Sequence, residues 1–297
     1  MKRFLFFGIL IFLVSSCAGP SKKEGAENFM VRRGHQLMAK GSLQLDRGCF
    51  RQGAADFTLA YDNFQASDHL PGMAQALNNL AVCLLELQET EKAALLASRA
   101  LTINRSLGDA SGQAANLSVL GKVHLIRGED KAALRLWQEA LDNARNGSQE
   151  LKGKILNDLG VAFMHAGQIK QARTHLNLAL DLIPDSPAVH QNLGKIAELS
   201  GHLSTAENHY VKALEIDRKK GDTPGIASDL AGLGKLYLKM DRKSEAAEIL
   251  ARAIGLRVLL SQKDKADALR EDLRRAGLKV AVPAGEPGGV EYLPPCQ

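Results

Sequence analysis

The sequence of 297 residues predicts an all-α protein, a superhelical solenoid of about six helical hairpins followed by a capping helix. Three observations predict this fold. Ala and Leu are abundant whereas aromatic residues make up only 5%, which favours helices over β-sandwiches. Small residues recur at three fixed offsets along most of the chain, which indicates a repeat. Within most units a glycine stands where a helix would have to end.

The three small positions define the units. The first of them is occupied in turn by Gly41, Ala81, Gly121, Gly160, Gly194 and Gly234. The second follows twelve residues later, at Gly53, Ala93, Ala133, Ala172, Ala206 and Ala246. The third follows after seven more, at Ala60, Ala100, Ala140, Ala179, Ala213 and Ala253. Small residues let two helix axes approach each other, so each unit is predicted to be a packed helical hairpin.

The turn inside each hairpin lies seven residues after the first small position. Glycine occupies it in four units, at Gly48, Gly128, Gly167 and Gly201. Glycine there can take the positive φ that ends a helix. In the other two units Gln88 and Asp241 replace it.

These six units resemble the tetratricopeptide repeat, which implies a right-handed superhelical α-solenoid over residues 30–262. Successive units start 40, 40, 39, 34 and 40 residues apart, whereas the usual repeat has about 34. Joining segments that read SDHLPG, LGDASG and KGDTPG account for the longer periods. The first unit fits least well, because Lys40 stands where a leucine is expected. The charged, amphipathic segment 263–280 is predicted to cap the last hairpin, and the Pro/Gly-rich segment 281–297 to form a flexible tail.

The first sixteen residues are predicted to be a lipoprotein signal peptide. Lys2 and Arg3 precede an apolar run, Phe4–Val14, which is too short to span a bilayer. Val14-Ser15-Ser16-Cys17 resembles a bacterial lipobox, which implies that Cys17 becomes the acylated first residue. The absence of Asp next to Cys17 favours the outer membrane, with the protein facing the periplasm. An ordinary signal peptide with a chance cysteine is the alternative, and residues 17–29 would be a polar tether.

The remaining cysteines carry no clear functional pattern. Cys83 falls on an apolar helix face and is predicted to be a core residue. Cys49 and Cys296 could form a disulfide in an oxidising periplasm, but their spacing does not require one. We leave that pairing open.

No motif indicates catalysis. Gly121-Lys122 lacks the preceding glycine and the following Ser or Thr of a phosphate-binding loop. No His-Glu-x-x-His, zinc-like spacing or Gly-x-Ser-x-Gly is present, and His190 is predicted to be a packing residue. We therefore expect no enzyme activity, metal, cofactor or small-molecule substrate. The formal net charge of +5 is too small and too scattered to indicate nucleic-acid binding.

The resemblance also implies a concave groove lined by the first helix of each hairpin. The groove-facing positions carry amides at Asn78, Asn79, Asn157 and Asn192 and lysines at Lys122, Lys195, Lys235 and Lys239. Amides can bind the backbone of an extended peptide, and lysines favour an acidic segment or a free carboxylate. The alternative is that these are ordinary solvated side chains. Asp158 on the same helix face would repel a carboxylate, which argues against a dedicated receptor for chaperone tails.

The sequence thus predicts a lipid-anchored envelope scaffold that binds proteins or extended peptides and assists assembly of an envelope complex. In organisation it is similar to the lipoproteins that assemble type IV pilus secretins. An adaptor for polysaccharide export or for cell-wall enzymes is the main alternative, and a hidden enzyme a remote one. The partner, the pathway and the oligomeric state stay open at this point.

Overall fold

The computed structural model describes residues 22–260 and 262–278, with side chains from residue 29 onward. These residues form thirteen α-helices and no strand. The helices are α1 (Lys22–Asp46), α2 (Phe50–Ala66), α3 (Leu70–Glu86), α4 (Thr90–Leu107), α5 (Ala110–Ile126), α6 (Asp130–Asn143), α7 (Gln149–His165), α8 (Ile169–Leu182), α9 (Pro187–Leu199), α10 (Leu203–Lys220), α11 (Thr223–Lys239), α12 (Lys243–Leu259) and α13 (Lys263–Arg275).

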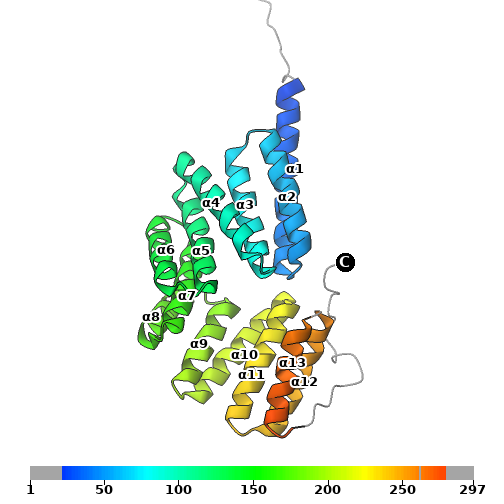
Figure 1. The fold of residues 1–297 in the computed structure, drawn as a ribbon, viewed down its shortest axis with the longest axis vertical. Helices are drawn as coiled ribbons and strands as arrows, with labels where there is room; N and C mark the ends of the chain where they lie inside the picture. The colour runs from blue at the N-terminus through cyan, green and yellow to red at the C-terminus, as the bar shows by residue number, and fades with distance from the viewer. Residues whose placement is uncertain (1–21, 261, 279–297) are drawn as a thin grey trace, which may run out of the picture.

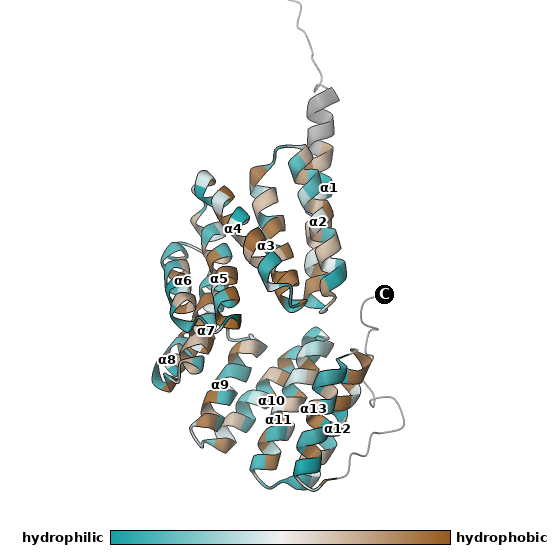
Figure 2. Ribbon diagram, in the orientation of Figure 1, coloured by the Kyte–Doolittle hydropathy of each residue, from teal (hydrophilic) through white to brown (hydrophobic). Residues whose placement is uncertain are grey.

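Consecutive helices form six antiparallel hairpins that stack side by side into a curved solenoid (Figure 1). Each odd-numbered helix up to α11 packs most extensively against the even-numbered helix that follows it. The thirteenth helix lies against α12 and covers the end of the stack. Hydrophobic and hydrophilic residues alternate around most helices, as expected when one face is buried (Figure 2). The predicted fold is confirmed.

The predicted helix crossings are also confirmed, and they explain why the first small position is small. A Cβ built on Gly121 would lie 2.6 Å from Cε2 of Trp137, which is fully buried sixteen residues later. The same clash would occur between Gly160 and Leu176, at 2.6 Å. In the second hairpin both places hold alanine, Ala81 and Ala97. Gly121 is therefore a packing residue, and Trp137 fills the space that the missing side chain leaves.

The turns inside the hairpins have the predicted backbone conformation. Gly48, Gly128, Gly167 and Gly201 have φ angles of 73°, 74°, 72° and 78°. Gln88 and Asp241, which replace glycine in the other two hairpins, adopt the same left-handed conformation with φ of 63° and 58°. The turn geometry is thus the same along the solenoid even where the residue is not glycine.

The first hairpin differs from the sequence expectation in one respect. Helix α1 begins at Lys22, so the helix extends into residues 17–29, which were expected to be a polar tether. Lys40, the unusual residue of this hairpin, forms an ion pair of 2.8 Å with the buried Asp56 of α2. At the other end, α13 lies inside the predicted capping segment 263–280.

Several predictions fall on residues outside the described part of the chain. These are the signal peptide at 1–16, the acylated Cys17 and the tail at 281–297. Among the cysteines, Cys83 is a buried free thiol, and burial raises its pKa to about 12. Cys49 is buried and takes part in a disulfide, whereas Cys17 and Cys296 lie outside the described residues. None of the helices in the described part combines the length and apolar character needed to span a bilayer.

Successive hairpins are connected by two kinds of joint, meaning the segment between the second helix of one hairpin and the first helix of the next. Helices α2, α4 and α10 have 17 or 18 residues and are followed by short joints, so that SDHLPG, LGDASG and KGDTPG extend through the joint into the first turn of the next helix. Helices α6 and α8 have only 14 residues and lead into different joints. In the joints after α2, α4 and α10 the residue just before the next helix caps it: His69, Asp109 and Asp222 accept from the backbone N–H three residues later.

Candidate partner-binding face

The first helices of hairpins 1 to 3 surround a hollow of about 370 Å³. We call it the inner hollow. Its lining includes His35, His69, Gln75, Asn78, Asn79 and Asn116, which come from α1, α3, α5 and the joint before α3. The sequence analysis singled out Asn78 and Asn79 as groove residues, and both lie here. The hollow is therefore a place where predicted groove amides meet an actual concavity.

Asn78 is held in place by a network of largely buried amides, which we call the amide cluster (Asn78, Asn104 and Asn116). Asn116 donates from Nδ2 to Oδ1 of Asn78 at 2.8 Å, and Asn104 donates from Nδ2 to Oδ1 of Asn116 at 2.7 Å. Asn116 is fully buried. Asn79 is half-buried, and its Nδ2 donates no hydrogen bond within the described residues. The cluster therefore positions one amide by hydrogen bonds and leaves its neighbour able to bind a ligand.

One wall of the inner hollow is aromatic. The ring centroids of His35 and His69 lie 5.7 Å apart, and those of His69 and the buried Phe64 lie 5.2 Å apart. His69 accepts the N–H of Gly72 on its Nδ1, so in the neutral ring Nε2 carries the proton. Sequence reasoning missed both histidines. For His69, aligning the repeats would have indicated a role, because His69 in SDHLPG occupies the position of Asp109 in LGDASG.

The other two predicted amides lie further along the solenoid and bind each other. Asn192 of α9 donates from Nδ2 to Oδ1 of Asn157 of α7 at 2.9 Å. One hairpin earlier, Ser118 of α5 donates to Oδ2 of Asp158 of α7 at 2.8 Å. These bonds link neighbouring first helices, so the residues support the stacking of hairpins and do not join the inner hollow.

Three of the four predicted groove lysines are already paired. Lys122 lies 3.4 Å from a carboxylate oxygen of Asp158, and Lys235 lies 3.1 Å from one of Asp272. Lys239 is paired with Glu198. Lys195 has no ion-pair partner among the residues described. Because their charges are largely offset within the chain, the lysines form no continuous basic side of a groove.

The joint between hairpins 5 and 6 contains an acidic counterpart of the amide cluster. This acid cluster consists of Gln191, Asp217 and Asp229, at repeat positions equivalent to those of Asn78, Asn104 and Asn116. Gln191 donates to Oδ1 of Asp229 at 2.5 Å. Both carboxyl groups are almost completely buried, and Oδ1 of Asp217 and Oδ2 of Asp229 have no other donor among the described residues. One proton shared between the two carboxyls satisfies both oxygens.

Burial is the main reason why both carboxyls hold protons unusually well. Burial, with a smaller contribution from the charge of Asp217, raises the pKa of Asp229 to about 8. Burial also raises the pKa of Asp217 to about 6, with a smaller contribution from Asp222. The acid cluster thus carries less negative charge at neutral pH than its composition suggests.

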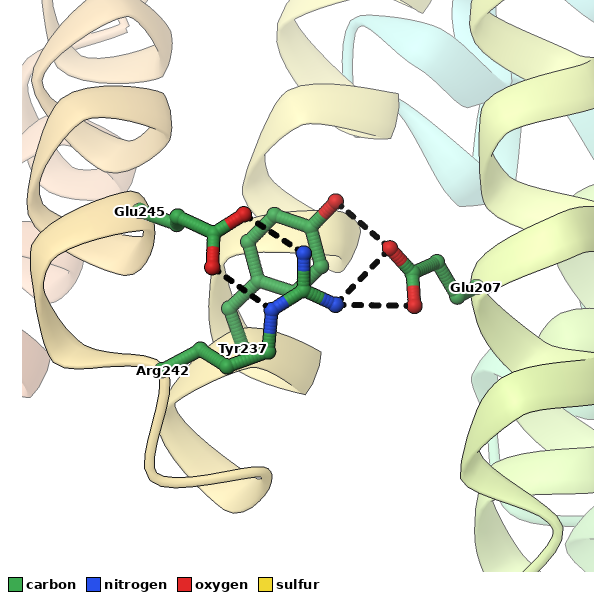
Figure 3. Close-up of polar contacts among 4 residues, drawn as sticks. All are labelled: Glu207, Tyr237, Arg242 and Glu245. Carbon is green, nitrogen blue, oxygen red and sulfur yellow. Dashed lines mark hydrogen bonds and ion pairs between the residues drawn. The ribbon is translucent and has the colours of Figure 1, made fainter.

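A separate polar cluster connects hairpins 5 and 6 near the turn between α11 and α12 (Figure 3). Arg242 donates two hydrogen bonds of 2.9 Å to Glu207 and two more, of 2.7 and 2.5 Å, to Glu245. Its guanidinium also lies 4.0 Å from the ring centroid of Tyr237, whose hydroxyl donates to Glu207 at 2.9 Å. Each charge has a partner, so this cluster is a structural link between hairpins.

No group of three or more His, Cys, Asp or Glu side chains in the described residues is placed to hold a metal ion.

The similarity of this chain to known proteins lies in its repeats. Models of the tetratricopeptide repeat match residues 38–110, 151–219 and 185–257, which together make up more than half of the chain.

Two curated proteins are similar to parts of the chain. Cellulose synthase operon protein C of Xanthomonas axonopodis pv. citri (strain 306) is 30% identical over 151 residues, which are 50% of this chain and 9% of that protein. Human protein O-mannosyl-transferase TMTC2 is 29% identical over 102 residues, which are 34% of this chain and 12% of that protein. The chain therefore spans only a small part of either relative.

Solved structures share the fold at low sequence identity. BtubC (BKLC) from P. vanneervenii has a TM-score of 0.54 at 17% identity, covering 81% of this chain and 93% of that one. A thermophilic tetratricopeptide repeat protein of Thermus thermophilus, TTC0263, has a TM-score of 0.52 at 24% identity, covering 68% of this chain and 98% of that one. With the repeat models, the six stacked hairpins and these neighbours in agreement, this chain belongs to the tetratricopeptide repeat family.

Proposed function

We propose that the protein is a non-catalytic scaffold that binds an extended segment of a partner protein in the inner hollow of hairpins 1 to 3. The observation that supports this most is the half-buried amide of Asn79, in a hollow of about 370 Å³: its Oδ1 accepts from Nδ2 of Asn78 at 3.5 Å, and its Nδ2 donates to no group in the described residues. An extended backbone offers one N–H and one C=O per residue, and side-chain amides can bind both. The rings of His35 and His69, which meet edge to face, provide a wall for a side chain of the partner.

This site favours a neutral or mixed segment over a strongly acidic one. The lysines that would attract acidic residues are mostly paired with Asp158, Asp272 and Glu198. Lys195 is the predicted groove lysine without an ion pair among the described residues. We therefore propose hydrogen bonding to the partner backbone as the principal means of recognition, with Lys195 as a secondary contact.

The test compares partner binding by variants of the hollow. Gln75→Ala combined with Asn79→Ala removes two exposed or half-buried amides. It takes away the acceptor of Nδ2 of Asn78 but leaves the hydrogen bonds among Asn78, Asn104 and Asn116 in place. The loss of two hydrogen bonds is expected to weaken binding of a captured partner segment by about tenfold or more, measured by isothermal titration. Asn143→Ala, on the second helix α6, is the matched control and should bind like the wild type. Equal binding by all three proteins would show that the partner does not use the inner hollow.

We further propose that the scaffold acts at the bacterial envelope, held there by a lipid on Cys17. This part rests on the lipobox-like segment Val14–Cys17 alone. Cys17→Ser should move the protein from the membrane fraction to the soluble fraction, with Cys83→Ser as the control that stays in place. Retention of Cys17→Ser in membranes would contradict the anchor and leave the binding proposal untouched.

Within the envelope, two kinds of complex are candidates. Assembly of a pilus or secretion complex follows from the combination of a lipobox with repeats. An adaptor role in polysaccharide production is supported by the similarity to cellulose synthase operon protein C, although the match covers 9% of that protein. Crosslinking of the membrane-bound protein, with the partners identified by mass spectrometry, separates the two.

A further inference from the structure

A second pocket, of about 500 Å³, lies where the first hairpin meets the last two. We call it the closure pocket. The curvature of the solenoid brings the turn after α1 to the start of α11, so that a Cβ on Gly48 would lie 2.7 Å from Cγ of Pro224. The pocket is bordered by this turn, by the joint between α10 and α11, and by the joint between α12 and α13. Segments far apart in sequence therefore form one concave site, separate from the inner hollow.

The most unusual residue of the closure pocket is Arg257 of α12. It is only 7% exposed, yet no carboxylate pairs with it in the described part of the chain. It donates to Oγ of Ser228 at 2.8 Å and to Oε1 of Gln262. Both acceptors are neutral, and burial lowers the pKa of the guanidinium. Arg257 is thus a buried cation without a counter-charge in the part of the chain that the structure describes.

Comparison with Arg242 shows how exceptional this is. Arg242 stands immediately before the same helix, is more exposed than Arg257, and binds two carboxylates, Glu207 and Glu245. A buried charge without a partner is costly, and such groups persist where they bind a ligand or serve a mechanism. The two hydrogen bonds of Arg257 use two of the five N–H donors of a guanidinium. Donors for an anion therefore remain.

Two more cations line the same pocket, Lys265 and Arg47. Lys265 is the third residue of α13, the position that holds Gly72, Gly112 and Gly225 in α3, α5 and α11. A second positive charge beside position 257 is thus specific to the last joint.

Carboxylates also line the closure pocket, at Glu86, Asp217 and Asp222. Asp217 shares a proton with Asp229, and Asp222 caps α11 by accepting the N–H of Gly225 at 3.0 Å. These two acids are already engaged, and Glu86 is exposed to solvent. The lining therefore holds three cations and three carboxylates, but among the described residues none of these carboxylates binds Arg257.

From this arrangement we propose that the closure pocket binds a small organic anion, whose carboxylate or phosphate group is received by Arg257 and supported by Lys265 and Arg47. Guanidinium groups bind both oxyanions through paired N–H···O bonds. The bound anion would supply the counter-charge that Arg257 lacks among the described residues. It would also connect the first hairpin to the last two, because Arg47 belongs to the former and Arg257 and Lys265 to the latter.

The experiment is a thermal-shift titration of the full chain with inorganic phosphate and, separately, with succinate. Sodium chloride at matched ionic strength controls for general salt effects, because screening acts on every surface charge. We expect a saturable rise in the midpoint with at least one probe, and the probe that binds tells phosphate from carboxylate recognition. The absence of a saturable response to both anions would overturn the proposal.

Variants locate the site. Arg257→Met keeps the length of the side chain and removes the charge, and it should weaken anion binding at least tenfold. Arg252→Met, five residues earlier on the same helix, is the matched control and should respond like the wild type. If Arg257→Met does not fold, the exposed Lys265→Gln replaces it and should weaken binding several-fold. Undiminished binding in the folded variant would show that the anion binds elsewhere.

Discussion

The joint between hairpins 2 and 3 and the joint between hairpins 5 and 6 are built alike and differ in chemistry. In both, a buried polar side chain in the last turn before the joint lies against a glycine of the next helix. A Cβ on Gly112 would be 2.4 Å from Nδ2 of Asn104, and one on Gly225 would be 2.1 Å from Oδ2 of Asp217. At each joint a hydrogen bond also links polar side chains of two neighbouring first helices. These side chains belong to the amide cluster at one joint and to the acid cluster at the other.

The difference shows that the backbone geometry of a joint does not determine how its stability depends on pH. Amides satisfy one another at every pH, because Asn104, Asn116 and Asn78 each offer a donor and an acceptor. Two carboxyls can do so only by retaining a proton. The same backbone therefore gives one joint that is insensitive to pH and one whose stability depends on it.

The direction of that dependence follows from the raised pKa values. The unfolded chain releases the proton of Asp229 near its ordinary value of 3.8, whereas the folded chain keeps it up to about pH 8. Between these limits the folded state binds more protons, so its stability falls as the pH rises from about 4 to about 8. The contribution of the shared proton is complete below about pH 4 and lost above about pH 8.

The largest effect is expected from transferring the acid cluster to the other joint. Asn104→Asp combined with Asn116→Asp should destabilise the protein on the order of 2 to 5 kcal/mol at about pH 8, and clearly less at about pH 5. Fluorescence of Trp137, the one tryptophan of the chain, follows unfolding next to this joint. An equal loss at both pH values would mean that the introduced carboxyls do not share a proton.

The reverse substitution should have a smaller effect of opposite sign. Asp229→Asn lets the amide donate to Asp217 and still accept from Gln191, so both hydrogen bonds run opposite to those of Asn116, which accepts from Asn104 and donates to Asn78. We expect a gain of about 1 to 3 kcal/mol at about pH 8 and a flatter dependence of stability on pH. Urea unfolding followed by circular dichroism at several pH values measures both. An unchanged pH profile would exclude the acid cluster as its source.

The smallest effects concern the outer members of the two clusters. Gln191→Leu removes the donor to Asp229 and Asn78→Leu removes the acceptor of Asn116, each at a cost of about 1 kcal/mol. The cost of Gln191→Leu should grow with pH, because an ionised carboxyl depends more on its donor. That of Asn78→Leu should be constant. The two unfolding profiles, compared at the same pH values, show whether this distinction holds.

The repeat register could be predicted from sequence because it depends on local constraints. A small residue such as Gly160 marks a helix crossing, and its filler Leu176 is a fixed sixteen residues away. Turn positions followed in the same way, including Gln88 and Asp241 without glycine. Side-chain volume and backbone φ repeat with every hairpin, so one alignment reveals both.

The polar contacts between hairpins could not be predicted so directly. Asn116 binds Asn78, 38 residues away, and Lys122 pairs with Asp158, 36 residues away, across the stacking direction. Which side chain each of these residues contacts depends on the tilt between neighbouring hairpins. The surroundings of Arg257 depend on the curvature of the whole solenoid, because the first hairpin forms one wall of its pocket. Aligning the joints would have shown the recurring positions, though not their partners.

The central claim is that a partner protein lies on the first helices of hairpins 1 to 3. Its most direct test places a photo-crosslinking amino acid at Asn79 in the inner hollow and, in a second protein, at Leu95 on α4, which is 62% exposed. We predict that the group at Asn79 crosslinks the protein to one partner, identified by mass spectrometry, and that the group at Leu95 does not. Crosslinks to that partner from Leu95 but none from Asn79 would contradict the account.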